Sequence, residues 1–182
     1  MAKLVSKTYG DALFQVAKEE NKIELFYDNI MAIEDYFDTQ SELTKVMAQP
    51  KIVKSEKIKM IEEIFAGKIE REIIGLLNLL IEKGHSVEIG SVFAYFIGCV
   101  KEEQGIGVAD VTTAVELREE QKQEIEKKLL ETTDYTSFEM HYAVDKKIIG
   151  GMIIRIGDRV VDSSIKTKIY GLSKELKNIQ LA

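Results

Sequence analysis

The 182-residue sequence has one cysteine, one proline, two histidines and no tryptophan. Because Cys99 has no second cysteine to pair with, an intrachain disulfide is excluded, and a cytosolic setting fits. Cys99 lies in an apolar run and is predicted to be a small buried residue. His85 and His141 are far apart in the sequence, so we expect no zinc site. The scarcity of proline, with abundant Glu, Lys, Leu and Ile, favours helix.

Long apolar runs are also missing. The longest, at 73–81 and 91–100, fall well short of the roughly 20 residues that span a bilayer, and the N-terminus lacks the apolar core of a signal peptide. The sequence therefore predicts a soluble chain that reaches a membrane only through partners, and the lack of a targeting segment favours a bacterial protein. A net charge of −6 argues against non-specific nucleic-acid binding, which needs a basic surface.

Motifs of catalysis are absent as well. There is no GxxxxGK[ST] phosphate loop, and Gly105 and Gly107 precede a strand, whereas a dinucleotide loop follows a strand and opens a helix. The glycine pair at 150–151 suits a bulge or strand crossing better than a phosphate. We therefore predict no catalytic residue, no cofactor and no metal. One alternative is a small enzyme that uses Asp158 or Asp162 with His141, whose turnover would be lost on His141→Ala.

The first half of the sequence has helical periodicity. Apolar residues recur at three- and four-residue spacing in six segments, and such one-sided stripes joined by short connections predict a six-helix bundle over residues 1–104. The first helix also has Phe14 off its stripe, which indicates packing on two sides or a second side for a partner. The fifth is apolar nearly all round, so it is either the central helix or keeps a face for a partner. The segments are 3–20, 22–38, 41–47, 55–67, 69–83 and 87–103.

The second half changes period. Alternating residues predict strands at 108–113, 138–144 and 152–156, with a charged helix over 117–131. Gly157-Asp158 is typical of a two-residue hairpin turn leading to a short return strand. Asp162, Ser163 and Ser164 then offer oxygens to cap a final helix, whose apolar stripe is Ile165, Ile169, Leu172, Leu176 and Ile179. The fold class is thus mainly α, a six-helix bundle followed by a small α+β domain over 105–182.

The final segment, IIGGMIIRIGDRVVDSSIKTKIYGL at 148–172, resembles the C-terminal signature of the δ subunit of F-type ATP synthases, whose mitochondrial homologue is the oligomycin-sensitivity conferring protein. Segments 8–17, 43–51 and 76–85 also resemble this family, in its order. Gly10 stands where the family usually has Ala, which should cost the helix up to about 1 kcal/mol. His85 stands where it usually has Arg, and is expected to be a surface loop residue.

The resemblance implies a non-catalytic stator subunit, present in one copy per complex, at the cytoplasmic face of the bacterial cell membrane. Its helical domain would bind the N-terminal helix of an α subunit on the catalytic head, and its C-terminal domain would bind the ends of b-type stalk subunits. An adaptor or regulatory module unrelated to ATP synthase is the alternative function. In this family the α-binding groove lies between the first and fifth helices. The positions of this sequence that correspond to the groove are Tyr9, Ala12, Leu13, Leu76, Leu79 and Lys83.

Two alternatives concern the surfaces themselves. The six groove residues could instead only pack the bundle. In the C-terminal domain, residues 151–182 hold six basic against three acidic residues, which indicates either solvated faces or a basic helix that meets an acidic partner. In the second case the residues expected to meet acidic stalk ends are Arg155, Arg159, Lys166 and Lys168.

Overall fold

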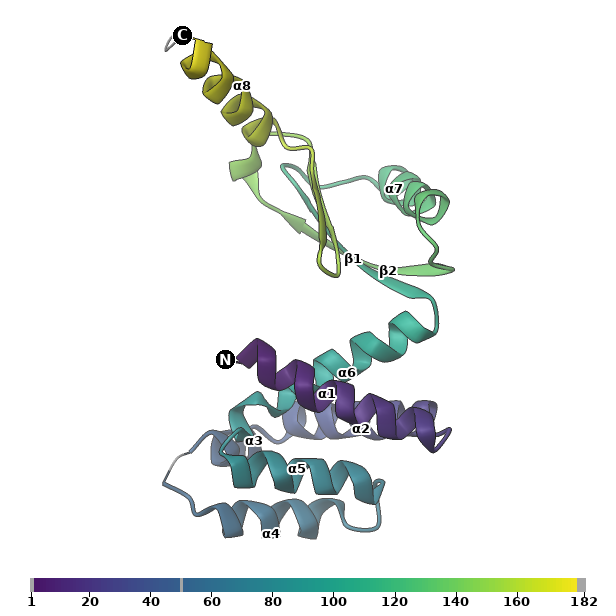
Figure 1. The fold of residues 1–182 in the computed structure, drawn as a ribbon, viewed down its shortest axis with the longest axis vertical. Coiled ribbons are helices and arrows are strands. Elements are labelled where there is room, and N and C mark those ends of the chain that lie inside the picture. Colours follow the sequence, from purple (N-terminus) through teal and green to yellow (C-terminus); the bar gives the residue numbers. More distant parts are fainter. Residues whose placement is uncertain (1, 50, 180–182) are drawn as a thin grey trace. The chain divides into compact units, whose positions relative to one another are not determined.

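The computed structural model describes residues 2–49 and 51–179. The chain divides into two compact units, Met1–Val100 and Lys101–Ala182, and each is described by itself. The first is helical and the second holds a four-stranded sheet with helices (Figure 1). The predicted fold class, a helical bundle followed by a small α+β domain, is confirmed. No helix among the described residues is long and apolar enough to cross a membrane.

The first unit contains the six predicted helices, close to their predicted bounds. Its large side chains form one core cluster, in which Phe26, Phe93 and Phe96 are fully buried. Phe14, off the main stripe of the first helix, packs its ring on Phe96 with centroids 6.1 Å apart, so that helix does pack on two sides. The helices are α1 (Ala2–Glu19), α2 (Ile23–Thr39), α3 (Ser41–Ala48), α4 (Lys54–Phe65), α5 (Arg71–Lys83) and α6 (Ile89–Glu103), with the short 3-10 helix η1 (Ser86–Glu88) before α6.

The fifth helix, α5, is central on one side and open on the other. Five of its apolar residues are buried, whereas Leu79 is 38% exposed. The helix ends at Gly84, whose φ of 80° is left-handed, and the His85 N–H donates to the Leu80 carbonyl at 2.8 Å. This C-terminal motif turns the chain into η1. Cys99 on α6, predicted to be buried, is only half-buried.

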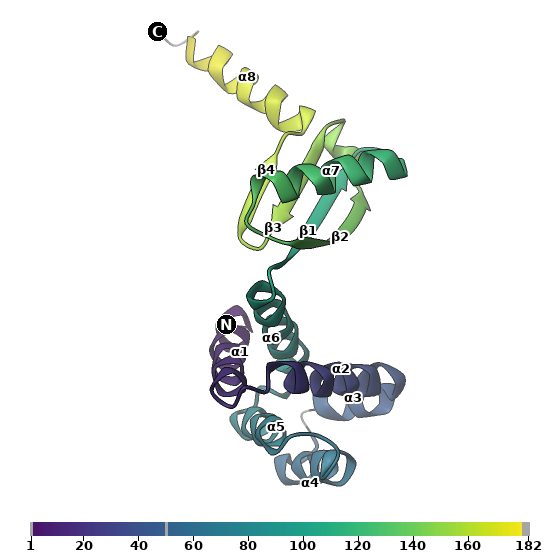
Figure 2. The same ribbon diagram turned by 90° about the vertical axis from the view of Figure 1, so that its right-hand side faces the viewer.

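The second unit is a mixed sheet of strand order β2-β1-β3-β4 with helix α7 on one face (Figure 2). β1 and β2 are parallel because α7 connects them as a crossover, whereas β3 pairs antiparallel with both β1 and β4. A short 3-10 helix, η2 (Lys146–Ile148), was not expected from the sequence. The other elements are β1 (Ile106–Thr113), α7 (Glu119–Thr132), β2 (Ser137–Val144), β3 (Met152–Ile156), β4 (Arg159–Asp162) and α8 (Ile165–Ile179).

The family-like segment at 148–172 forms the hairpin and helix start that its residues predict. Gly157 has a φ of 55°, and the two-residue turn brings Ile156 opposite Arg159. The Asp162 carboxylate accepts the Ser164 N–H at 2.8 Å, which fixes the entry into α8. Gly151 has no room for a side chain, because a Cβ there would lie 2.5 Å from the Ser163 carbonyl oxygen. This glycine therefore serves close backbone packing.

Candidate partner-binding surfaces

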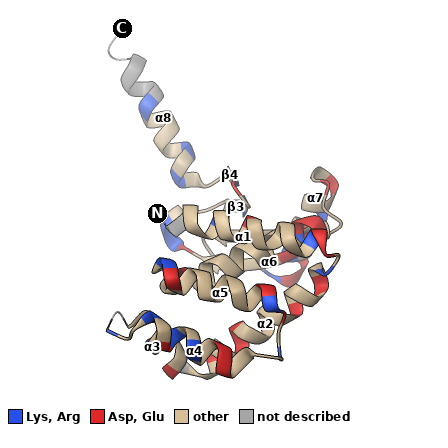
Figure 3. Cartoon of the chain, turned by 60° about the horizontal axis from the view of Figure 1, so that its bottom comes forward, with Lys and Arg blue, Asp and Glu red and all other residues tan. Residues whose placement is uncertain are grey.

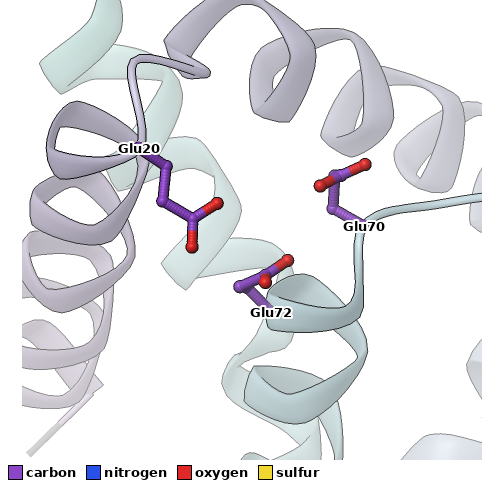
Figure 4. A group of neighbouring side chains, drawn as sticks. All are labelled: Glu20, Glu70 and Glu72. Carbon is purple, nitrogen blue, oxygen red and sulfur yellow. The ribbon is translucent and has the colours of Figure 1, made fainter.

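Helices α1 and α5 pack side by side and run antiparallel. At one end, the ring of Tyr9 on α1 lies 6.3 Å from the ring of His85, just past the end of α5. At the other end, carboxylate oxygens of Glu20, just past α1, and Glu72, in the first turn of α5, approach within 4.8 Å (Figure 4). The two helices thus lie side by side over about the length of α5.

The structure separates the six residues predicted for this surface into two groups. Ala12, Leu79 and Lys83 are exposed and Tyr9 is half-buried, so their side chains are open to a partner. In contrast, Leu13 and Leu76 are only 4% and 9% exposed and belong to the core cluster. These two leucines pack the bundle beneath the surface. Binding by all six residues stays a prediction.

Four residues of α5 follow one helical stripe, Glu72, Leu76, Leu79 and Lys83. Leu79 and Lys83 are exposed, whereas Glu72 is half-buried and Leu76 is nearly buried. The spacings of four, three and four residues place them on one face. Leu76 lies lowest, with little exposure, and Leu79 stands out beside it. Ala12 on the neighbouring helix α1 is exposed, and its small side chain permits close approach of another helix. We refer to Ala12 on α1 and this stripe on α5 as the α1–α5 surface.

Sequence reasoning missed three residues at the Tyr9 end of this surface. Leu4 and Val87 are each 71% exposed, and Val87 belongs to η1, which packs against α1. His85 was expected to be a surface loop residue, but it is half-buried beside Tyr9 with its Nδ1 3.9 Å from a Glu88 oxygen. The only signal in the sequence was that the apolar Val87 follows His85 by two positions. Such a pattern is too weak to predict a contact.

At the opposite end, three carboxylates converge: one from the residue just past α1, one from the residue just before α5 and one from the first turn of α5. Figure 4 shows Glu20, Glu70 and Glu72 directed toward one another. The Lys22 ammonium lies 2.9 Å from both Glu20 and Glu70, and its hydrogen bonds to these carboxylates raise the pKa of Lys22 well above its ordinary value. Lys22 thus supplies a cation to two of the three. The third carboxylate, Glu72, keeps a buried oxygen with no hydrogen-bond partner among the described residues.

A second exposed apolar surface lies on α8, in the other unit. Ile165, Ile169 and Leu172 are 42%, 53% and 60% exposed, so the predicted stripe is not covered by its own unit. Leu176 and Ile179, also predicted on it, lie outside the side chains that the structure describes. Figure 3 shows basic residues along the described part of α8. The four basic residues that are expected to meet acidic stalk ends are all exposed: Arg155, Arg159, Lys166 and Lys168.

The sheet does not bring together the residues of the alternative in which the protein is a small enzyme. His141 is on β2 and Asp162 is on β4, at opposite edges of the sheet. The His141 ring instead lies between Asp110 Oδ1, at 3.3 Å from Nδ1, and Glu139 Oε1, at 3.1 Å from Nε2. Asp158 is in the turn between β3 and β4, also away from β2. The proposed grouping of His141 with either aspartate is therefore wrong.

Each unit exposes large apolar side chains on a helix, on α5 and on α8, which is typical of a protein that binds other chains. The family model described as "ATP synthase delta (OSCP) subunit" matches residues 5–176. The chain therefore belongs to the ATP synthase delta (OSCP) subunit family. It is a non-catalytic stator component of an F-type ATP synthase and thus takes part in proton-coupled ATP synthesis. The alternative of an adaptor unrelated to ATP synthase is wrong.

Individual relatives agree with this family over nearly the whole chain. The ATP synthase subunit delta of Lachnoclostridium phytofermentans is 50% identical over 181 residues, covering 100% of both chains. That of Brevibacillus brevis is 35% identical over 169 residues, covering 93% of this chain and 96% of the relative. A chain in the Toxoplasma gondii mitochondrial ATP synthase hexamer has a similar fold, with a TM-score of 0.77 at 20% identity, covering 94% of this chain and 96% of that one.

Proposed function

We propose that this stator subunit joins the catalytic head to the peripheral stalk, in one copy per complex, at the cytoplasmic face of the bacterial membrane. The helical unit binds the N-terminal helix of an α subunit, and the sheet-containing unit binds the C-terminal ends of b-type stalk subunits. The observation that carries this proposal is that each unit exposes large apolar side chains on a helix: Leu79 on α5, and Ile165, Ile169 and Leu172 on α8. A tether requires two such surfaces and a connection, and it requires no active site.

The α1–α5 surface has the properties of a helix-binding site. Leu79 offers apolar area, Tyr9 offers a half-buried aromatic ring, and the small Ala12 leaves space for a helix to approach. An amphipathic helix laid on this surface would bury its apolar face against these residues. If Tyr9 and the leucines form a desolvated centre, nanomolar affinity, roughly −12 kcal/mol, is within reach.

The α8 surface suits a partner of opposite charge. Ile169 and Leu172 present apolar area, and Lys166, Lys168 and Lys174 flank them on the described part of the helix. A stalk helix with an apolar stripe bordered by carboxylates would complement both features. The lysines would increase the rate of encounter and fix the register, while the apolar contacts would supply most of the affinity.

Calorimetric titration with a peptide of the α subunit's N-terminal helix, from the same organism, tests the proposed contact with the α subunit. We expect one-to-one binding that Ala12→Asp weakens strongly, because the new carboxylate would have to be desolvated against an apolar helix. Ala12 is exposed, so the variant should fold. The matched control is Ala94→Asp, an exposed alanine on α6 away from the α1–α5 surface. Equal affinity of Ala12→Asp and wild type would exclude this surface as the α-binding site.

A further inference from the structure

One residue of the second unit has a backbone conformation that its own side chain disfavours. Ile149, directly after η2, has a φ of 71° and a ψ of −42°. A positive φ is uncommon for any residue with a Cβ atom, and it is an outlier for a β-branched residue. Asn21 is the only other non-glycine residue with a positive φ in the described part of the chain, and asparagine tolerates this conformation. The isoleucine at position 149 therefore strains the folded protein.

The segments on both sides of Ile149 fix this conformation. Before it, Ile148 is 4% exposed, so η2 is anchored in the unit. After it, the Gly150 carbonyl accepts the Ile165 N–H at 2.9 Å, and a Cβ atom at Gly150 would lie 2.6 Å from Ile165 Cδ1. The chain has to turn at residue 149 to make both contacts. Glycine would make the same turn with less strain, so the turn does not explain the isoleucine.

The core of the unit does not explain the isoleucine either. The side chain of Ile149 is 62% exposed, and it therefore gains little from burial in the free protein. Strained residues cluster at sites where a ligand or a partner binds. A partner chain that buries this side chain would account for both the conformation and the exposure of Ile149.

Ile149 lies beside the start of the exposed apolar stripe on α8. The hydrogen bond between Gly150 and Ile165 places it next to the first residue of that stripe, and η2 packs against α8. From this arrangement we propose that Ile149 is an anchor of the α8 surface. Held in its strained conformation, it extends the apolar stripe toward η2 and is buried when the C-terminal end of a b-type stalk subunit binds. This inference rests on the proposed function, since it concerns the same partner.

Basic residues border this extended surface and indicate the chemistry of its occupant. Lys146 and Lys147 in η2 directly precede the strained turn, and Lys166 and Lys168 are in the first turns of α8; all four are exposed. The occupant is therefore a chain end with apolar residues flanked by carboxylates. Because the backbone of Ile149 is fixed before this partner arrives, little conformational entropy is lost there on binding.

Calorimetric titration of the full-length protein with a peptide from the C-terminal end of a b-type subunit, from the same organism, tests the anchor. We expect Ile149→Gly to weaken binding at least about tenfold, because one buried apolar side chain is lost. The melting temperature of the free variant should be unchanged or higher, because glycine relieves the strain. A residue that only supports the fold would not combine weaker binding with undiminished stability.

Two further variants are the controls. Ile149→Met keeps an apolar side chain and should retain most of the affinity, whereas Asn21→Gly changes the other positive-φ residue, in the first unit, and should leave stalk binding unchanged. Equal affinities of Ile149→Gly and wild type, or a clearly lower melting temperature of Ile149→Gly, would overturn the anchor and leave the proposed function standing. Failure of the wild-type protein to bind the peptide would remove the proposed stalk contact itself.

NMR with methyl-labelled isoleucine locates the contact directly. On titration with the same peptide, we expect the δ1-methyl signals of Ile149, Ile165 and Ile169 to move together. The signal of Ile61, which is buried in the first unit, should stay in place. Movement of Ile165 and Ile169 without Ile149 would confine the stalk contact to α8 and overturn the anchor.

Discussion

Gly10 on α1 lies directly against the ring of Tyr95 on α6, so that a Cβ atom added at Gly10 would meet Tyr95 Cδ1 at 2.5 Å. The Tyr95 hydroxyl donates to Asp11 Oδ1 at 2.9 Å, which fixes the ring over the glycine. Burial and the Asp11 carboxylate raise the pKa of the Tyr95 hydroxyl above its ordinary value. The sequence alone indicated only a loss of helix propensity at Gly10; the structure adds a packing reason for the glycine.

Gly10→Ala should therefore destabilise the protein, although alanine is the better helix former. We expect a loss of about 1 kcal/mol, because the cost of overpacking exceeds the gain in helix propensity. Urea unfolding measures the change. The control is Gly98→Ala on α6, where nothing lies within 4 Å of the added Cβ, and which should gain up to about 1 kcal/mol. Equal stabilisation by the two substitutions would contradict the contact with Tyr95.

A buried lysine gives the second prediction. Lys57 on α4 is 5% exposed, and its ammonium donates to the Met47 carbonyl at 2.6 Å, near the end of α3. The Ser86 hydroxyl donates to the same carbonyl at 2.9 Å. Lys57→Met keeps the side-chain volume and leaves the carbonyl one partner, so we expect a change within about 1 kcal/mol. Removing both donors should cost about 1–3 kcal/mol beyond the sum of the single changes.

The double-mutant cycle of Lys57→Met and Ser86→Ala measures this coupling by denaturant unfolding. The coupling arises because only the double variant leaves the buried Met47 carbonyl without a donor. Additive single changes would show that solvent reaches this carbonyl, and that the two bonds are dispensable.

The elements of the fold follow from local patterns, whereas contacts between distant segments do not. Apolar spacing predicts the helices and strands, and Gly157-Asp158 and Asp162 predict the hairpin turn and the helix start, because each depends on neighbours within a few residues. The contact between Gly10 and Tyr95 joins residues of two helices far apart in sequence. No local pattern specifies such a contact, since it depends on how α1 and α6 cross.

The location of the candidate site stays a prediction from the resemblance, whereas the exposure of its residues is visible only in the structure. Resemblance to the family indicated the first and fifth helices, and apolar residues were present on both. Which of them face outward depends on the rotation of each helix in the bundle, so Leu76 is nearly buried whereas Leu79 is exposed. Lys57 illustrates the same limit. A lysine is predicted to be solvated, yet here a free carbonyl at a helix end provides it with a buried acceptor.

The exposed apolar stripe on α8 predicts that changing one of its leucines weakens binding to the stalk. Leu172→Ser should weaken binding of a peptide from the C-terminal end of a b-type subunit about tenfold, the effect of removing one apolar side chain from an interface. The melting temperature should stay the same, because Leu172 is 60% exposed in the free protein. Leu130→Ser on α7, which is 37% exposed, is the control and should leave stalk binding unchanged. Equal binding by Leu172→Ser and wild type would place the stalk contact elsewhere.

The Asp162 carboxylate makes the start of α8 sensitive to acid. The Ser164 hydroxyl and N–H and the Thr167 hydroxyl stabilise its charged form and lower the pKa of Asp162 below its ordinary value. A carboxyl whose pKa is lower in the folded state stabilises that state above the unfolded pKa of about 3.9. This contribution is lost as the pH falls through the folded pKa.

We therefore expect the amide chemical shifts of Ser164 and Thr167 to titrate together, with a midpoint below about 3.9. Thr167→Ala removes one hydrogen bond to the carboxylate and should move the midpoint upward, toward the ordinary pKa. Asp162→Asn has no carboxyl and should abolish the transition, while leaving the shifts of α1 and α5 unaffected. NMR spectra recorded between pH 6 and pH 2 measure all three. A midpoint at or above the ordinary pKa of aspartate would mean that these hydrogen bonds do not hold the charged carboxylate at the start of α8.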